Sequence, residues 1–192
     1  MRNVLARRNL LKALPLTAVS FALAATRTAA QEQAAGSGRT LVAYYSRTGN
    51  TAVIARQIRR ARDAALFQIK TAAPYPEDYE ETVEQARRET RSDYLPPLAH
   101  VVADMSQYDT IYLGLPIWGM TAPPVIRSFL MAHDLSGKTV VPFITHGGYG
   151  LGNSVDVLRA HMRGADLRPA FSMEADQERR TLEQVSGWLT SF

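Results

Sequence analysis

The chain has 192 residues, 46% of them hydrophobic, and contains no cysteine. This is enough apolar material for one folded domain, and the lack of cysteine excludes a disulfide scaffold, a Cys-ligated metal site and a thiol nucleophile. The formal net charge of +4 comes from residues 1–30, which hold five basic residues and no acid. The rest of the chain has 17 of the 22 basic residues and all 18 acidic ones, a net charge of about −1. Nucleic acid is therefore not an expected partner.

Residues 1–30 have the pattern of a cleavable signal peptide. A basic stretch over 1–12 precedes an apolar segment, and small residues follow before Gln31. The longest charge-free run there, 13–26, has 14 residues, whereas a helix needs about 20 to span a bilayer. We therefore expect no permanent membrane anchor.

The signal is similar to the twin-arginine type. Arg7-Arg8 is followed by Lys12, and the apolar segment is only weakly hydrophobic, which favours this folded-protein export route over a general secretory signal with two chance arginines. We expect a periplasmic or otherwise exported protein. Residues 31–38, rich in Ala, Gly, Gln and Ser, indicate a linker, and 39–192 form the predicted domain.

From residue 39 onward, short apolar runs alternate with helical stripes, which is typical of alternating strands and helices. We expect strands at 41–45, 65–69, 108–115, 139–144 and, more weakly, 167–173. Helices are expected between them: after Thr51, at 76–91, from Pro123-Pro124, around 155–162 and from about Gln177. Five strands separated by helices predict an α/β domain with a parallel sheet covered on both faces.

The helix expected at 76–91 is very polar. Its apolar stripe consists only of Tyr79, Val83 and Ala86, which predicts a surface position. Its acidic residues are interpreted as a solvated face rather than as a surface that steers partners.

The turn after the first strand consists of Ser46-Arg47-Thr48-Gly49-Asn50-Thr51. It offers three hydroxyls, an amide, a guanidinium and a flexible glycine, and it leads into a helix. Backbone N–H groups at a helix N-terminus lack intrahelical partners and, with the helix dipole, bind anions such as phosphate. The same residue types are preferred at a capped helix after a tight turn, and the turn alone fits both interpretations equally well.

Two further strands end in unusual turns, 115–123 and 146–153. The first holds Trp118, and the second places four glycines around Tyr149. In a parallel sheet these two turns and the turn after the first strand all lie at the carboxyl ends of the strands. Two aromatic side chains there would sandwich a planar ring. FMN combines a phosphate with such a ring. Each feature also has a local explanation, since Trp118 would cap the sheet and glycines are common in turns.

Residues 42–51 resemble the flavodoxin signature, in which a strand leads into Ser/Thr-x-Thr-Gly-x-Thr and a helix. Further similarity to a bacterial branch of flavodoxin-like proteins covers nearly all of 39–192, through segments 74–76, 109–118, 122–123 and 137–152. The resemblance implies a flavodoxin-like three-layer sandwich with a five-stranded parallel sheet of order 2-1-3-4-5 and bound FMN.

By position, the resemblance assigns cofactor contacts to all three turns. The phosphate would be held by Ser46, Thr48, Gly49, Asn50 and Thr51. Trp118 and Tyr149 would flank the isoalloxazine ring. For Arg47, at the variable position of the loop, we favour an orientation toward water over a contact with the phosphate. The remaining expected contacts are Pro116, Ile117, Gly119, His146, Gly147, Gly148 and Gly150.

Two features depart from the family. The related branch carries Trp-Trp-Gly where this chain has Trp118-Gly119-Met120. Electron-carrying flavodoxins are usually strongly acidic, which steers them toward partners, whereas this chain without residues 1–30 is nearly neutral.

The four histidines are scattered without ligand spacing, so no metal site is expected. His133-Asp134 is interpreted as the cap of the preceding helix. Only His146 adjoins the expected site, as a hydrogen-bond donor to the flavin or a proton donor to a reduced substrate.

The leading hypothesis is an exported FMN-binding redox protein that passes electrons through the flavin to an unknown redox partner protein or a quinone-like small molecule. No catalytic side chain is assigned, because the cofactor would carry the chemistry. One alternative is an NAD(P)H-dependent FMN-containing quinone reductase, since the same fold serves both. Another is a non-redox module that binds a different phosphorylated ligand.

Overall fold

The structure is a computed structural model that describes residues 39–175 and 178–191. The expected signal peptide and linker lie outside these residues. Within them, parallel strands form one sheet of order β2-β1-β3-β4-β5, with β6 also paired to β4, which confirms the expected order. The strands are β1 (Thr40–Tyr44), β2 (Ala65–Gln68), β3 (Thr110–Pro116), β4 (Thr139–His146), β5 (Asp166–Leu167) and β6 (Phe171–Glu174).

The fifth position of the sheet holds two short strands instead of the single strand expected at 167–173. Both β5 and β6 pair with β4. Arg168 still donates its N–H to the carbonyl of Val140 at 2.9 Å, and regular pairing with β4 resumes at Phe171. Pro169 lies in the interruption between the two short strands.

The helices lie close to their expected positions, and a short 3-10 turn at Met105–Gln107 precedes β3. The helices are α1 (Asn50–Arg62), α2 (Tyr79–Arg91), α3 (Pro124–Ala132), α4 (Ser154–His161) and α5 (Glu178–Leu189). No helix in the described ranges is both long enough and apolar enough to cross a bilayer.

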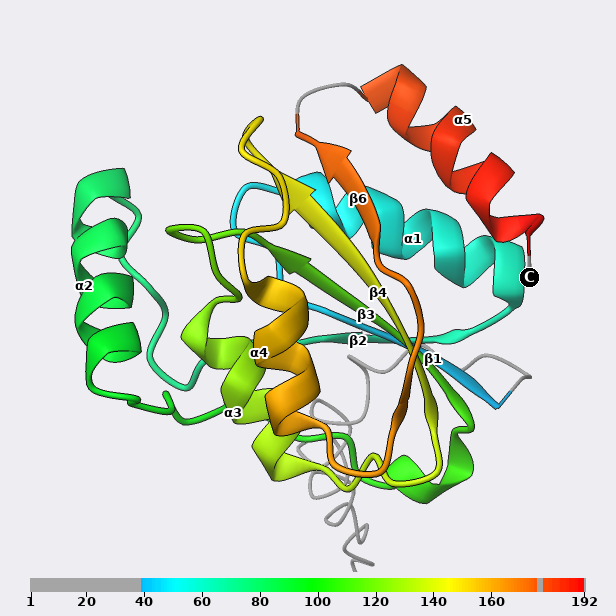
Figure 1. Cartoon of the computed structure of the whole chain (residues 1–192), viewed down its shortest axis with the longest axis horizontal. Coiled ribbons are helices and arrows are strands. Elements are labelled where there is room, and N and C mark those ends of the chain that lie inside the picture. The colour runs from blue at the N-terminus through cyan, green and yellow to red at the C-terminus, as the bar shows by residue number, and fades with distance from the viewer. Residues whose placement is uncertain (1–38, 176–177, 192) are drawn as a thin grey trace, which may run out of the picture.

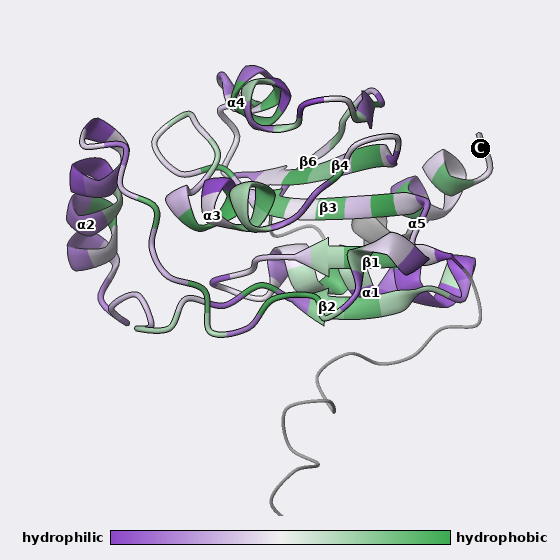
Figure 2. Cartoon of the chain, turned by 90° about the horizontal axis from the view of Figure 1, so that it is seen from below, coloured by the Kyte–Doolittle hydropathy of each residue, from purple (hydrophilic) through white to green (hydrophobic). Residues whose placement is uncertain are grey.

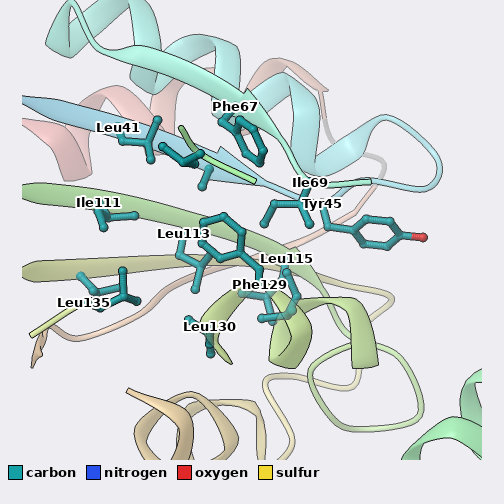
Figure 3. Close-up of a cluster of buried hydrophobic side chains, with 14 of the residues drawn as sticks. Leu41, Tyr45, Phe67, Ile69, Ile111, Leu113, Leu115, Phe129, Leu130 and Leu135 are labelled. Carbon is teal, nitrogen blue, oxygen red and sulfur yellow. The ribbon is translucent and has the colours of Figure 1, made fainter. Parts of the chain in front are cut away.

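Alternation along the strands builds two hydrophobic layers. Leu41 and Ala43 face a cluster that includes α3 and α4 residues, whereas Val42 and Tyr44 face one that includes α1 and α5 residues. Helices therefore cover both faces of the sheet (Figure 1). In Figure 3 the first cluster lies against α3, and the Tyr45 ring extends out of it.

Helix α2 is the exception, because it covers neither face of the sheet. It stands beyond the carboxyl ends of the strands in both views (Figures 1 and 2). Within the connection between β2 and β3, the two segments that flank α2 are joined by an isolated antiparallel bridge between Thr71 and Leu98. The helix begins at Tyr79 rather than at residue 76, because the Asp78 side chain accepts the N–H of Glu81 at 2.9 Å and caps it.

Candidate functional site

A cavity of about 650 Å³ lies between the carboxyl ends of the strands and α2. Its lining comes from the loops after β1, β3 and β4 and from one face of α2. Ten of the fifteen expected site residues line it: Arg47, Thr48, Asn50, Thr51, Pro116, Ile117, Trp118, Gly119, His146 and Gly147. The other five, Ser46, Gly49, Gly148, Tyr149 and Gly150, belong to the same loops but are not part of the lining.

The loop after β1 forms a tight turn into α1. Its Ser46 hydroxyl accepts the N–H groups of Gly49 at 3.2 Å and Ala52 at 3.3 Å. Gly49 has φ +98°, a conformation that glycine adopts without steric cost. The capped-turn interpretation therefore describes the Ser46 side chain, while Thr48, Asn50 and Thr51 line the cavity at the positive end of the helix dipole.

The start of α1 and the end of β4 are joined by a buried hydroxyl pair. The Oγ1 atoms of Thr51 and Thr145 are 2.8 Å apart, and both residues are buried. Thr145 was not predicted as a site residue, because its neighbour across the sheet cannot be read from one sequence. The pair fixes the start of α1 against β4, which holds two walls of the cavity in register.

Arg47 reaches across to the segment that carries α2. Its Nη2 donates to the carbonyl oxygen of Glu77 at 2.8 Å, and its guanidinium lies 5.7 Å from the centre of the Tyr79 ring. This differs from the orientation toward water that we favoured. The guanidinium finds a carbonyl and an aromatic face because the β2–β3 connection folds back over the first loop.

Trp118 packs against two tyrosines at the carboxyl ends of the strands. Its ring meets Tyr45 at 5.4 Å and 83° and Tyr75 at 4.9 Å and 88°, both edge-on. Burial raises the pKa of both phenols, and for Tyr75 a hydrogen bond to Glu89 raises the pKa further. Both therefore stay neutral at physiological pH.

The loop after β3 turns sharply behind Trp118. The N–H and C=O groups of Trp118 and Thr121 are mutually hydrogen-bonded, at 3.0 and 3.2 Å. The two residues between them, Gly119 and Met120, have φ +56° and +69°. This left-handed pair makes a tight turn that fits the sharply twisted hairpin, and the departure from Trp-Trp-Gly leaves a methionine in a conformation that favours glycine.

The glycine-rich loop after β4 is organised by His146. Its Nδ1 accepts the N–H of Gly148 at 3.1 Å and that of Gly150 at 3.4 Å. An accepting Nδ1 leaves the proton of the neutral ring on Nε2. Tyr149, at the tip of the loop, is 80% exposed and does not line the cavity. Of the two aromatic residues expected to flank the ring, only Trp118 lines the cavity.

The comparisons with known proteins agree with this geometry. A family model described as Flavodoxin matches residues 39–191. The chain belongs to the flavodoxin family. A protein from Bacteroides uniformis assigned as a flavoprotein is 32% identical, with a TM-score of 0.71 over 80% of this chain and 98% of that one. A similarly assigned protein from Bacteroides eggerthii is 31% identical, with a TM-score of 0.69 over 79% and 96%.

A flavoprotein from Lactobacillus acidophilus, solved in complex with FMN, shares the fold of this flavodoxin. It is 22% identical, with a TM-score of 0.63 over 75% of this chain and 97% of that one. No curated protein matches the chain.

The cavity of this flavodoxin has the donor set that FMN requires. One end has hydroxyls and the N-terminus of a 13-residue helix for a phosphate. Trp118 supplies an aromatic surface for the ring, and no acidic residue lines the cavity within the described part of the chain. In those residues no group of three His, Asp or Glu side chains is placed to hold a metal ion.

The α2 wall is the part of this flavodoxin's site that sequence reasoning missed. Thr82 and Ala86 are buried, and with Val83 and Thr90 they line the cavity. The stripe at Tyr79, Val83 and Ala86 is visible in the sequence, but the polarity of the helix predicts a surface position. The stripe faces a cavity rather than the sheet. The sequence pattern alone does not show which of the two an apolar stripe faces.

Proposed function

We propose that this flavodoxin is an exported FMN-binding redox protein that transfers electrons through the flavin. The observation that carries the proposal is the cavity itself, with an anion-binding helix N-terminus at one end and the buttressed Trp118 ring in its wall. FMN, when bound, supplies an electron carrier that takes up and releases one or two electrons. Every other contribution comes from the protein.

The protein's residues divide the work of binding. Thr48, Thr51 and the backbone N–H groups at the start of α1 would hold the phosphate, except the N–H of Ala52, which the Ser46 hydroxyl accepts together with that of Gly49 and so keeps the turn in shape. Tyr45 and Tyr75 fix the Trp118 ring edge-on, so that the ring is pre-organised for stacking. Helix α2 closes the outer side of the cavity and limits the access of water.

The binding proposal is tested by titrating flavin-free protein with FMN and following the quenching of flavin fluorescence. We expect one FMN per chain, and we expect Gly49→Val to weaken binding by about tenfold or more, about 1.4 kcal/mol, because it distorts the phosphate turn. The matched control is Gly137→Val. Gly137 also has positive φ and open space around its Cβ position, but it precedes the amino end of β4.

Equal FMN affinity in the two variants would show that the turn does not hold the cofactor. Protein that stays colourless with FMN would instead favour the non-redox module that binds a different phosphorylated ligand.

Export by the twin-arginine route is the second half of the proposal. A route that carries folded proteins moves the domain with its cofactor already bound, whereas an unfolded route delivers the empty chain. We expect Arg7→Lys together with Arg8→Lys to retain a reporter fusion in the cytoplasm. Unchanged export of the fusion would assign the signal to the general secretory route.

A reductase of quinones is a second candidate, favoured by the α2 wall. A carrier that docks on another protein needs an accessible cofactor edge, whereas a walled cavity of about 650 Å³ suits a small-molecule substrate beside the cofactor. Rapid bleaching of the bound flavin by NADPH, with turnover on a quinone, would favour the quinone reductase over the electron carrier. Bleaching only by a protein reductant would favour the electron carrier.

A further inference from the structure

The wall that α2 contributes to the cavity is basic. The lining residues on α2 recur every three or four positions and so form one face of the helix: Tyr79, Thr82, Val83, Ala86, Arg87, Thr90 and Arg91. Together with Arg47, the two arginines of this face give the cavity three cations, and none of its described lining residues is Asp or Glu. A small anion that enters the cavity therefore meets a positive wall.

The arginines of α2 lie far from the phosphate turn. Arg47 marks the amino end of the helix, through its hydrogen bond to Glu77 and its contact with the Tyr79 ring. With a rise of 1.5 Å per residue, Arg87 and Arg91 lie about 12 and 18 Å further along the helix axis than Tyr79. One phosphate cannot use both ends.

The aromatic part of the cavity lies toward these two arginines. Tyr75 packs edge-on against Trp118, and its hydroxyl donates to Glu89 at 2.6 Å. Glu89 lies between Arg87 and Arg91 in the sequence of α2. The Trp118 ring is therefore anchored to the carboxyl-terminal half of α2.

Arg87 and Arg91 are also available for a ligand. Within the part of the chain that the structure describes, neither guanidinium makes a hydrogen bond or an ion pair, and both residues are exposed. Their neighbour Arg88, by contrast, pairs with Glu84 one turn away, at 3.7 Å. Arg87 lies at the border of the helix face that lines the cavity, and it also lines a groove on the outer side of α2.

We propose that Arg87 and Arg91 bind the anionic group of a small aromatic co-substrate that lies against the ring end of the cavity. Its chemical class is a planar compound with a carboxylate or sulfonate, which the guanidinium fork binds in two-pronged fashion. Val83 and Ala86 supply apolar surface for its ring. The inference rests on the proposed function, because FMN occupies the phosphate end.

The test uses FMN-loaded protein and two probes, anthraquinone-2-sulfonate and the neutral 2-(hydroxymethyl)anthraquinone, with binding measured by calorimetry. We expect the sulfonate to bind more tightly, and more weakly as salt is raised. The variant Arg87→Gln/Arg91→Gln should lose about tenfold in sulfonate affinity and keep its affinity for the neutral probe and for FMN. The control Arg88→Gln should match the wild type.

Three outcomes would overturn the subsite. The first is equal binding of the two probes to the wild type, and the second is an equal loss in the Arg88→Gln control. The third is a lower FMN midpoint potential in the double variant with unchanged sulfonate binding, because the arginines would then act on the cofactor. A chain that fails to bind FMN overturns the proposed function, whereas an FMN-loaded chain indifferent to the sulfonate overturns only the subsite.

Discussion

Single residues set the shape of the loops around the cavity. The second and third loops touch where the N–H of Asn153 donates to the carbonyl oxygen of Met120 at 3.0 Å. Gly152 lies directly beside this contact, and a Cβ there would overlap the same carbonyl oxygen. Two loops that approach this closely need a residue without a side chain at that position.

We expect Gly152→Ala to lower the free energy of unfolding by about 3 kcal/mol, because overlap with backbone adds to the left-handed strain. Gly150→Ala is the matched control. Gly150 has φ +76° in the same loop but open space around its Cβ position, so only the strain of about 1 kcal/mol applies. Urea denaturation measures both, and equal losses would mean that the two loops do not touch.

His133 is the C-cap residue of α3, as its position after the helix indicated, and its imidazole is half-buried. Its Nδ1 lies 2.7 Å from the carbonyl oxygen of Phe129, and its Nε2 accepts the N–H of Val102 at 2.9 Å. Burial lowers the pKa of His133 below its usual 6.5, although the Phe129 carbonyl works in the opposite direction. Protonation would occupy the nitrogen that accepts from Val102.

Stability should therefore depend on pH through His133. A lowered folded-state pKa means that the unfolded chain binds the proton more readily, so this contribution is complete above about pH 6.5 and is lost as pH falls below it. We expect His133→Gln to lower the unfolding free energy at pH 7 by about 1 kcal/mol and to lose less on acidification to pH 5. Parallel pH profiles for variant and wild type would contradict this assignment.

At the scale of elements, the position of α2 depends on a few polar contacts rather than on the core. Arg47 holds its amino end. At its carboxyl end, the buried Arg127 of α3 donates to Asp93 at 2.9 Å and to the carbonyl oxygen of Glu89 at 3.5 Å. A helix held in this way opens more easily than one packed on the sheet.

Removal of the Arg127 contacts should loosen α2 while the sheet stays intact. We expect Arg127→Met to cost about 2 kcal/mol, because hydrogen bonds of a charged group are lost while the aliphatic part of the side chain is kept. Hydrogen exchange should accelerate in 79–91 and not in β3. The control Arg159→Met removes an exposed pair with Asp156 and should cost about 0.5 kcal/mol or less. Uniform acceleration across the domain would assign Arg127 to the core instead.

At the scale of the molecule, the sheet and its helices were predictable because local patterns specify them. Alternation along β1 and the stripe of α1 need no distant partner to be recognised, and the resemblance supplied the strand order. What depends on distant residues was not predictable. Arg47 donates a hydrogen bond to Glu77, Thr51 is hydrogen-bonded to Thr145, and the apolar stripe of α2 lines the cavity. Each of these contacts joins segments that only the folded chain brings together.

In the proposed function, the turn after β1 holds the phosphate of FMN at the start of α1. Backbone amide signals, followed by NMR while FMN is added to isotope-labelled protein, show whether it does. We expect the amide signals of Thr48, Asn50 and Thr51 to shift most, together with those of Trp118 and Gly147, and to saturate at one equivalent of FMN. Shifts confined to other regions, or none at all, would contradict it.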